Sequence, residues 1–357
     1  MERLLVPGGG RTYPVLVGTG LLDELGAILA REGISGRMAV FADEAVYALF
    51  GERMRKALPE ASFATVPAGE AAKTIREAER LWGILAEGGF GRRDVAISVG
   101  GGATSDLVGF VAATYHRGMP VVHVPTTLLS QVDASVGGKT AIDHPLAKNL
   151  VGAFHAPHLV VADLDTLGTL PARERWCGLA EVVKAALIAD ADLVALLEER
   201  LEALAQGEAV LLEPVVARAI RIKAEVVAAD EFDHGRRQVL NFGHTLGHAL
   251  ETATGFDRLR HGEAVVLGMR AAVHLSRRLG RLDSKEAERV LALLTRFPLP
   301  DVVLPSPEAV LCASRRDKKG AGAFVTIGPI GEARVEVVED ALLFDALETL
   351  YEGAANR

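Results

Sequence analysis

Cysteine is scarce in this chain, and its scarcity argues against two kinds of site. Only Cys177 and Cys312 occur among the 357 residues, far apart and outside any CxxC motif. A disulfide framework needs several cysteines, and a structural zinc site usually needs cysteine thiolates. We therefore expect neither feature, and a reducing cytoplasm suits such a chain.

Basic tracts and long apolar runs are missing as well. The chain has 39 Lys and Arg against 47 Asp and Glu, a formal net charge of −8, with no interleaving of basic and aromatic residues. Nucleic acid is therefore not an expected partner. No window is apolar for about 18 residues, and the N-terminal segment lacks an apolar stretch followed by a small-residue cleavage site. We expect a soluble, unexported protein with no membrane partner.

Hydrophobic residues make up 49% of the chain and charged residues 24%, enough for a large core and two domains. In the first half, short β-branched or apolar runs alternate with segments of helical periodicity. The predicted strands are 14–18, 37–42, 63–68, 94–99, 120–125 and 158–163. Strands that alternate with helices favour a mainly parallel sheet.

After Pro171 the pattern becomes helical, and strand signals fade until AFVTIG at 323–328. The sequence therefore predicts an α/β domain over 1–170 and a mostly α-helical domain over 171–357.

A glycine-rich turn carries the first functional signal. DVAISV-GGGATSD-LVGFVAATY predicts a strand, a turn and a helix, so that backbone N–H groups can approach a phosphate at the helix N-terminus. A plain tight turn is an equally good interpretation of the glycines alone. Asp43 ends an earlier strand, where a carboxylate can bind a ribose, and Thr126 and Thr127 follow another strand.

Histidines and a glutamate carry the second signal. His244 and His248 are spaced to share one helical face, and His261 stands beside Glu263 at the start of another helix. Two histidines can also share a face without binding anything. Glu181 lies three residues before Lys184, a spacing that also suits a solvated ion pair. Mixed His and carboxylate ligands without Cys favour a catalytic metal.

Cations carry the third signal. Each one alone is most simply a surface charge, but together they suggest a site for a small polyanion within an acidic protein. They are Arg117, Lys139, Lys148, Lys184, Lys223, Arg237 and the pair Lys318-Lys319.

Taken together, the motifs resemble the 3-dehydroquinate synthase family over nearly the whole chain. The longest matching block is VPTTLLSQVDASVGGKTAIDHPLAKNLVGAFHAP at 124–157. The others are GEAAKT at 69–74, GGGATSD at 100–106, GLAEVVKAALI at 178–188, LNFGHTLGHALE at 240–251, HGEAVVLGM at 261–269 and DKKG at 317–320. The resemblance implies a Rossmann-like NAD-binding domain followed by a helical metal- and substrate-binding domain.

The resemblance also implies which residues form the site. Zn²⁺ or Co²⁺ would bind Glu181, His244 and His261, while His248 would face the substrate. The expected NAD contacts are Asp43, Glu70, Lys73, Gly101, Gly102, Ala103, Asp106, Thr126, Thr127, Lys139, Lys148, Thr166 and Thr169. The expected catalytic and substrate-binding residues are Arg117, Asp133, Lys139, Asn149, Lys184, Lys223, Arg237, Asn241, His248 and Lys318.

The implied reaction converts 3-deoxy-D-arabino-heptulosonate 7-phosphate into 3-dehydroquinate and phosphate, the second step of the shikimate pathway. It combines transient oxidation by NAD⁺, phosphate elimination, re-reduction, ring opening and an intramolecular aldol closure. The alternatives are a related sugar-phosphate cyclase, a glycerol-dehydrogenase-like polyol oxidoreductase, or a catalytically silent NAD- or zinc-binding scaffold.

The resemblance further implies a homodimer, because the counterpart of Arg117 in family members can reach the neighbouring subunit's site. Two positions depart from the family's pattern. Ser105 replaces a glycine that many members have, and Cys177 replaces a small polar residue. Glycine at position 105 would permit closer packing of the turn.

Overall fold

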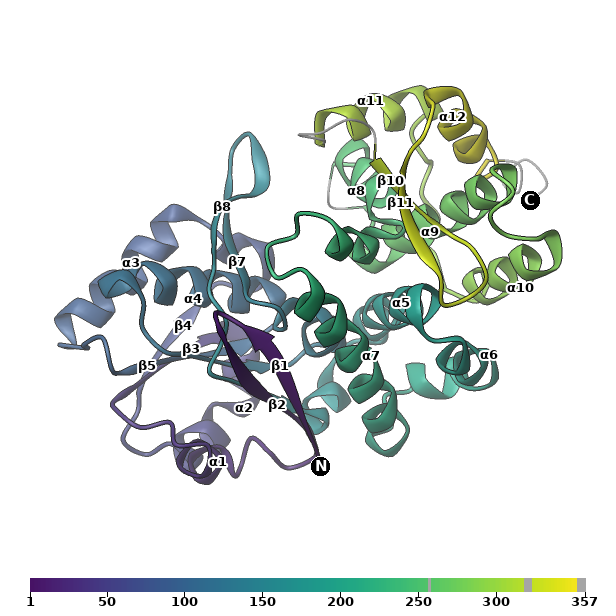
Figure 1. The fold of residues 1–357 in the computed structure, drawn as a ribbon. Helices are drawn as coiled ribbons and strands as arrows, with labels where there is room; N and C mark the ends of the chain where they lie inside the picture. The colour runs from purple at the N-terminus through teal and green to yellow at the C-terminus, as the bar shows by residue number, and fades with distance from the viewer. Residues whose placement is uncertain (256–257, 318–322, 352–357) are drawn as a thin grey trace. The chain divides into compact units, whose positions relative to one another are not determined.

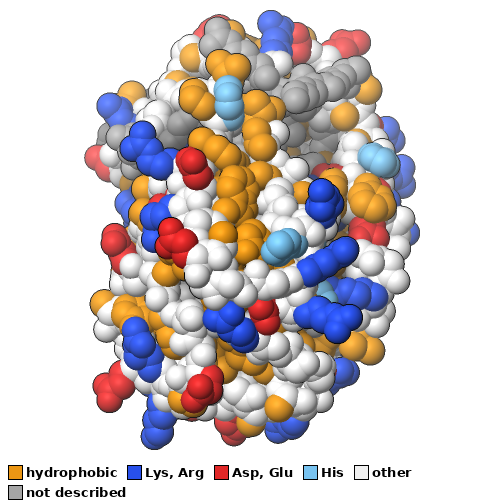
Figure 2. Space-filling model, turned by 90° about the vertical axis from the view of Figure 1, so that its left-hand side faces the viewer, with side chains coloured by type: hydrophobic (Ala, Val, Ile, Leu, Met, Phe, Trp, Pro, Cys, Tyr) orange, Lys and Arg blue, Asp and Glu red, His pale blue; other side chains and the backbone are white. Residues whose placement is uncertain are grey.

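The computed structural model describes residues 1–255, 258–317 and 323–351. Two compact units make up the chain. The first comprises Met1–Arg175 and Gln206–Phe232, and the second comprises Trp176–Ala205 and Asp233–Arg357. Within the described residues, no helix is long and apolar enough to cross a bilayer. Lys and Arg side chains are interspersed with Asp and Glu side chains on the face shown in Figure 2.

The first unit holds nine strands: β1 (Glu2–Gly8), β2 (Arg11–Gly18), β3 (Met38–Asp43), β4 (Ser62–Val66), β5 (Val95–Gly100), β6 (Val121–Pro125), β7 (Lys139–His144), β8 (Ala147–Phe154) and β9 (Leu159–Asp163). Its helices are α1 (Leu25–Arg31), α2 (Glu44–Ala57), α3 (Ile75–Glu87), α4 (Gly102–Thr114) and α7 (Ala209–Ala229). Short helical turns are η1 (Gly69–Ala72), η2 (Tyr115–Arg117), η3 (Ser130–Ala134) and η4 (Leu164–Thr169).

The second unit is mostly helical (Figure 1). Its elements are α5 (Ala172–Ala189), α6 (Ala191–Ala205), η5 (Arg236–Asn241), α8 (His244–Ala253), α9 (His261–Arg278), α10 (Ser284–Thr295), α11 (Pro307–Asp317), β10 (Ala323–Ile327), β11 (Ala333–Val337) and α12 (Asp340–Glu348).

The main sheet of the first unit has the order β1-β2-β9-β6-β5-β3-β4, and all its pairings except β1 with β2 are parallel. Strands β5, β6 and β9 are buried along their whole length, which explains their continuous apolar sequences. Alternate residues of β3 serve opposite faces: Val40 packs with α1 and α2, and Phe41 packs with α3 and α4. The predicted α/β class and its parallel sheet are confirmed.

The strand order creates a switch point between β3 and β5. From β3 the chain moves outward to β4, and then crosses to the other side of β3 to form β5. The connections that follow β3 and β5 leave in opposite directions, and the carboxyl ends of strands at such a switch point are where α/β folds bind ligands. Asp43 ends β3 and Gly100 ends β5, so the predicted nucleotide residues lie at this point.

Three parts of the first unit were not expected from the sequence. Strand β1 and the antiparallel β7–β8 hairpin were missed, and the hairpin projects from the sheet in Figure 1. Helix α7, which was expected in the second domain, packs against β1, β2 and η3 of the first unit. The unit changes at Arg175, close to the expected boundary at 170. A helix pattern identifies a buried face but not the surface that covers it.

Glycines bring the helices of the second unit into backbone contact. A Cβ atom on Gly268 of α9 would lie 1.9 Å from the carbonyl oxygen of Gly243, and one on Gly247 of α8 would lie 3.1 Å from the carbonyl oxygen of Ala264. Helices α8 and α9 therefore run antiparallel and touch without intervening side chains. A Cβ on Gly262 would lie 2.4 Å from the Cα of Cys177, so α9 meets α5 as closely.

We predict that Gly268→Ala lowers the free energy of unfolding by at least about 2 kcal/mol, because the added methyl group must push α8 and α9 apart. Gly83→Ala is the matched control, since Gly83 lies inside α3 with nothing within 4 Å of its Cβ position. The control should be neutral or stabilising by roughly 0.5–1 kcal/mol. Thermal unfolding followed by circular dichroism measures both. Equal midpoints for the two variants would contradict the close packing.

Candidate functional site

Three side chains from three helices of the second unit converge at one point. Glu181 projects from the middle of α5, and His244 and His261 are the first residues of α8 and α9. Oε1 of Glu181 lies 3.4 Å from Nε2 of His244 and 3.4 Å from Nε2 of His261. Both carboxylate oxygens are buried, and neither makes a hydrogen bond of good geometry.

This arrangement fits a metal ion better than a hydrogen-bonded network. One ligand atom from each residue can be chosen so that all three lie within 4.8 Å of one another. Tetrahedral zinc ligands about 2.0–2.1 Å from the ion are separated from each other by roughly 3.3 Å. The two distances of 3.4 Å agree with that spacing. Two imidazoles and one carboxylate are also the ligand set of catalytic zinc sites.

Burial and neighbouring charges shift the pKa values of these groups in directions that favour the binding of a cation. Burial lowers the pKa of His244 to about 3, so this imidazole is neutral and able to coordinate. Burial alone would raise the pKa of Glu181, but Lys184 and the imidazoles hold it well below its usual value. Burial would also lower the pKa of His261, but Glu181 and Glu251 outweigh it and raise that pKa to about 10. The two carboxylates thus favour positive charge at His261, from a proton or from a metal ion.

The neighbouring residues have distinct positions. Lys184 lies with its Nζ 2.5 Å from Oε2 of Glu181, and both side chains are buried, so the pair is not a solvated surface contact. The ring of His248 lies beside those of His244 and His261, with centroids 5.3 and 5.8 Å away. Glu263 has a structural role, because it accepts a hydrogen bond from the backbone N–H of Arg260 and caps α9.

In the first unit, the glycine-rich turn lies at the switch point of the sheet. Gly101 caps α4, Gly102 and Ala103 begin it, and a Cβ on Gly102 would lie 2.9 Å from the Cβ of Ala134. The carboxylate of Asp43 accepts hydrogen bonds from the backbone N–H groups of Ala45, Val46 and Gly69.

The predicted threonines lie on the same edge of the sheet, after β6 and β9. The Oγ1 atom of Thr126 is buried and has no hydrogen-bond partner, whereas that of Thr127 pairs with Ser130. Thr166 donates to the carbonyl of Asp163 at the end of β9, and Thr169 donates to the carbonyl of Thr166 within η4. An unsatisfied buried hydroxyl is uncommon in a folded protein, so Thr126 offers a free polar group for a ligand.

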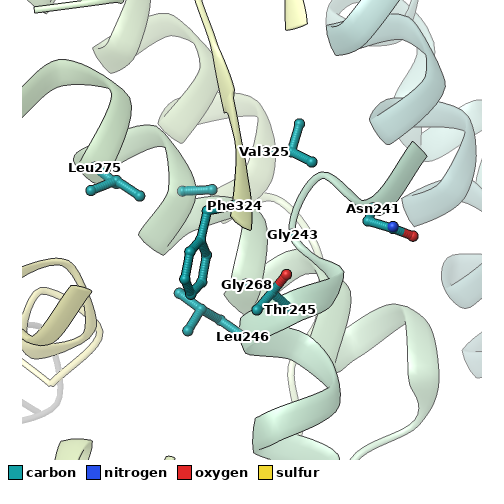
Figure 3. A pocket seen from close by; sticks show the side chains of 9 residues that line it. Asn241, Gly243, Thr245, Leu246, Gly268, Leu275, Phe324 and Val325 are labelled. Atoms are coloured by element: carbon teal, nitrogen blue, oxygen red, sulfur yellow. The ribbon is translucent and has the colours of Figure 1, made fainter. Parts of the chain in front are cut away.

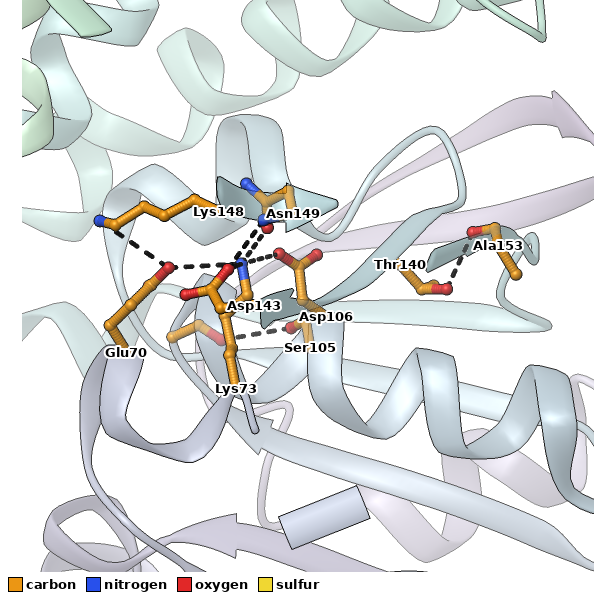
Figure 4. Close-up of polar contacts among 10 residues, drawn as sticks. Glu70, Lys73, Ser105, Asp106, Thr140, Asp143, Lys148, Asn149 and Ala153 are labelled. Carbon is orange, nitrogen blue, oxygen red and sulfur yellow. Dashed lines mark hydrogen bonds and ion pairs between the residues drawn. The ribbon is translucent and has the colours of Figure 1, made fainter. Parts of the chain in front are cut away.

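Lys73 is the centre of a charged network shown in Figure 4. Its buried Nζ lies 2.9 Å from Asp106 and 3.5 Å from Glu70, and it donates to Oδ1 of Asn149. Burial alone would lower the pKa of Lys73, but the surrounding carboxylates raise it. Burial raises the pKa of Asp106 to about 6 even though Lys73 opposes the shift.

Asp143 joins the β7–β8 hairpin to this network. Its Oδ1 accepts from the backbone N–H of Asn149 at 2.8 Å, and its own N–H donates to the carbonyl of Lys73 at 2.8 Å. Asn149 has a left-handed backbone with φ of 53°, so a side-chain partner stabilises a conformation that few residues adopt. Lys148, next to it, is more exposed and lies 3.9 Å from Glu70.

The other predicted substrate residues fall in both units. In the first unit, Lys223 of α7 donates to Asp133 of η3, at 2.7 Å to the carbonyl and 2.5 Å to the carboxylate. Arg117 and Lys139 are exposed there, and Arg117 has a positive φ of 64°. In the second unit, η5 carries Arg237, which is buried, and Asn241, which is exposed. Lys318 lies outside the described residues.

A small pocket lies beside the start of α8. Figure 3 shows Phe324 and Leu246 on one side and Asn241 on the other. The depression holds about 230 Å³ of space not filled by atoms, part of it open to solvent, and its lining is largely apolar. None of the three converging metal-ligand candidates lines it.

Both halves of the chain are similar to proteins of one known family. A model of the N-terminal part of 3-dehydroquinate synthase matches residues 63–176, and a model of its C-terminal part matches residues 178–320. The chain belongs to the 3-dehydroquinate synthase family. The 3-dehydroquinate synthase of Symbiobacterium thermophilum is 46% identical over 93% of this chain and 95% of its own length. That of Halorhodospira halophila is 42% identical over 98% of this chain and its own full length.

A solved structure of a differently named synthase is also similar to this chain over nearly its whole length. It is 2-epi-5-epi-valiolone synthase of Streptomyces hygroscopicus subsp. jinggangensis with NAD⁺ and Zn²⁺ bound. Its identity to this chain is 30%, with a TM-score of 0.87, over 96% of this chain and 97% of that one. The expected family and fold class are thus confirmed. A protein described as a probable glycerol dehydrogenase from Sinorhizobium meliloti shares the fold at 19% identity with a TM-score of 0.65.

The two residues that depart from the 3-dehydroquinate synthase pattern, Ser105 and Cys177, both lie at helix packing positions in the structure. Ser105 is buried in the first turn of α4, and its hydroxyl donates to the carbonyl of Gly101 at 3.4 Å. Cys177 lies where α5 meets Gly262 of α9.

Two residues near these clusters were missed at the sequence level. Asp143 holds the hairpin, and Glu251 lies 3.5 Å from Nδ1 of His261. Glu251 follows His248 by three residues, so the helical spacing that revealed the histidines also indicated this carboxylate. Asp143 gave no such signal, because the hairpin itself was not predicted.

We predict that Lys73→Met destabilises the first unit by about 2–4 kcal/mol at pH 8, because it leaves the carboxylates of Asp106 and Asp143 without their cation. The loss should be smaller at pH 5. The pKa of Asp106 is raised, so the folded protein binds extra protons between its ordinary pKa and about 6, and stability falls as pH rises through this range. Removing Lys73 extends that fall to higher pH.

Thermal unfolding at pH 5 and pH 8 tests this prediction, with Lys148→Met as the control. Lys148 is exposed, and its ion-pair distance is 3.9 Å, so its loss should cost little at either pH. A pH-independent effect of Lys73→Met would argue against the charged network.

Proposed function

We propose that this chain catalyses the conversion of 3-deoxy-D-arabino-heptulosonate 7-phosphate to 3-dehydroquinate and phosphate. The observation that carries the proposal is the convergence of Glu181, His244 and His261 at the spacing of metal ligands in a chain of the 3-dehydroquinate synthase family. The reaction is a phosphate-eliminating carbon–oxygen cleavage, so the enzyme is a lyase.

The proposed cofactors are NAD⁺ and one Zn²⁺ or Co²⁺. The solved relative at 30% identity carries NAD⁺ and Zn²⁺. When bound, NAD⁺ supplies a reversible oxidation of a substrate hydroxyl, and the metal makes that hydroxyl more acidic. We assign the metal to the three converging residues and NAD⁺ to the carboxyl edge of the parallel sheet.

The proposed NAD⁺ contacts come from groups at the N-terminus of α4 and on the loops that follow the strands. The N-terminus of α4 at Gly101 and Gly102 presents backbone N–H groups and the positive end of the helix dipole to a pyrophosphate. The unpartnered hydroxyl of Thr126 can donate to the same ligand. The further NAD contacts in this proposal are Asp43, Glu70, Lys73, Ala103, Asp106, Thr127, Lys139, Lys148, Thr166 and Thr169.

The substrate-binding residues are proposed from their charge and chemistry. A phosphorylated sugar acid carries two anionic groups, and Arg237 offers a guanidinium fork that matches a planar carboxylate. His248 and Lys184 lie beside the metal ligands, where they can orient the substrate. The phosphate and hydroxyl contacts are assigned to Arg117, Asp133, Lys139, Asn149, Lys223, Asn241 and Lys318.

We also propose that the enzyme is a cytoplasmic homodimer. Leu146, Leu150, Val151 and Phe154 of the β7–β8 hairpin segment are exposed large apolar residues, and a group of such residues marks an interaction surface. The resemblance to the family, which implies that Arg117 reaches the neighbouring subunit's site, points to the same assembly.

We predict that His261→Ala loses most of its bound metal, because two ligands remain where three are needed. His248→Ala should retain the metal but lose turnover, since His248 lies beside the ligand rings without belonging to the set of Glu181, His244 and His261. Elemental analysis after gel filtration and an activity assay measure the two properties separately. Full metal content in His261→Ala would refute the assignment.

A second prediction separates the synthase from a polyol dehydrogenase. The purified protein, incubated with the heptulosonate phosphate and a trace of NAD⁺, should release many phosphate ions per NAD⁺, because the hydride returns to the product. Phosphate release and absorbance of NADH are followed together. NADH that accumulates in step with substrate loss would instead indicate the dehydrogenase. A related cyclase would turn over its own sugar phosphate but not this carboxylated one.

A further inference from the structure

Glu251 lies against the side of His261 that faces away from Glu181. Its Oε2 is 3.5 Å from Nδ1 of His261, while Nε2 of the same ring is 3.4 Å from Oε1 of Glu181. The imidazole is therefore placed between two carboxylates, one at each nitrogen. Glu251 is buried, so this carboxylate has been removed from water, a costly placement that requires a partner.

The packing of α8 on α9 fixes this contact. The two helices run antiparallel, with Gly243 against Gly268 and Gly247 against Ala264. One further turn along α8 brings Glu251 level with His261 at the start of α9. The backbone contact at the glycines leaves little freedom for either residue to slide along the other helix.

His244 is oriented in a comparable way. Its Nδ1 lies 3.2 Å from the carbonyl oxygen of Phe242, which leaves Nε2 directed at Glu181. In both histidines the Nδ1 atom thus has an oxygen acceptor and the Nε2 atom points to the proposed metal position. A ligating imidazole usually donates its other N–H to a carboxylate or carbonyl, which fixes its tautomer and its orientation.

From these contacts we propose that Glu251 is a positioning residue, which accepts the Nδ1–H of His261 and holds its Nε2 in place for the metal. The inference rests on the proposed metal site and adds to it a residue outside the ligand set. Glu251 itself does not contact the ion.

A second cation site is the alternative that the same geometry raises. His248, Glu251 and His261 also offer ligand atoms within 4.8 Å of one another. That site would need the Nδ1 atom of His261 as a ligand while its Nε2 atom binds the first ion. One neutral imidazole cannot coordinate through both nitrogens without losing its N–H proton, so we favour the hydrogen bond.

The test measures metal affinity in the purified holoenzyme. Zn²⁺ is withdrawn by a competing chelator to give its Kd, and the visible absorption of the Co²⁺-substituted protein reports the ligand geometry. Glu251→Ala should raise the Kd for Zn²⁺ by about 10- to 100-fold, the usual effect of losing such a partner, and should alter the Co²⁺ bands. Glu251→Gln keeps a hydrogen-bond acceptor of the same size and should restore most of the affinity and the spectrum.

Thr252→Ala is the matched control, because Thr252 is the next residue of α8 and is exposed. It should leave the Kd and the spectrum unchanged. Should Glu251→Ala fail to fold, Glu251→Gln still decides the matter: a Co²⁺ spectrum and Kd close to wild type support the acceptor role, and a loss of metal equal to that of His261→Ala opposes it.

Three results would overturn the inference. One is a Glu251→Ala protein with unchanged Kd and spectrum but a lowered unfolding temperature, which would make the residue merely structural. Another is two Zn²⁺ ions per wild-type chain, one of which disappears in the variant. The third is a metal content insensitive to His261→Ala, which would refute the proposed metal site itself.

Discussion

The close approach of α9 to its neighbours is the constraint on which the second unit depends. At Gly262 and Gly268 the backbone of α9 lies so near to α5 and α8 that no side chain fits between them. Helix termini packed in this way have little room to shift, and interiors at this density transmit small displacements directly. The ligand candidates His244 and His261 begin two of these helices, so their separation follows from backbone packing.

In the first unit, the order of the strands rather than helix packing determines where the candidate site residues lie. The connections that follow β3 and β5 run in opposite directions, and Asp43, the glycine-rich turn and the threonines after β6 lie at the carboxyl edge of the sheet near this switch point. Ion pairs and hydrogen bonds then hold the neighbouring loops in position. Lys73 binds the helical turn η1 to Asp106 and to the β7–β8 hairpin, and Asp143 supports Asn149 at the hairpin.

Much of this arrangement could be predicted from the sequence. Buried parallel strands such as β5 and β9 are continuous apolar runs, and the glycines that follow β5 marked the turn. The resemblance to the family supplied Glu181, which spacing alone would not have separated from a surface ion pair with Lys184. Long-range packing was beyond these patterns. Helix α7 is amphipathic whichever unit covers it, and the exposed strand β8 lacks the alternation that would reveal it.

The pairing of Glu181 with Lys184 has an electrostatic consequence for any ion held there. The carboxylate and the ammonium group are 2.5 Å apart and buried together, so their formal charges cancel. With neutral imidazoles, the ligand set and its lysine offer a divalent ion no net negative charge. These residues then leave the ion's charge uncompensated, and the buried carboxylate of Glu251 beside His261 offsets only part of it, so the remainder attracts anions in a low-dielectric interior. A substrate with an anionic group close to the ion is therefore favoured at such a site over a neutral one.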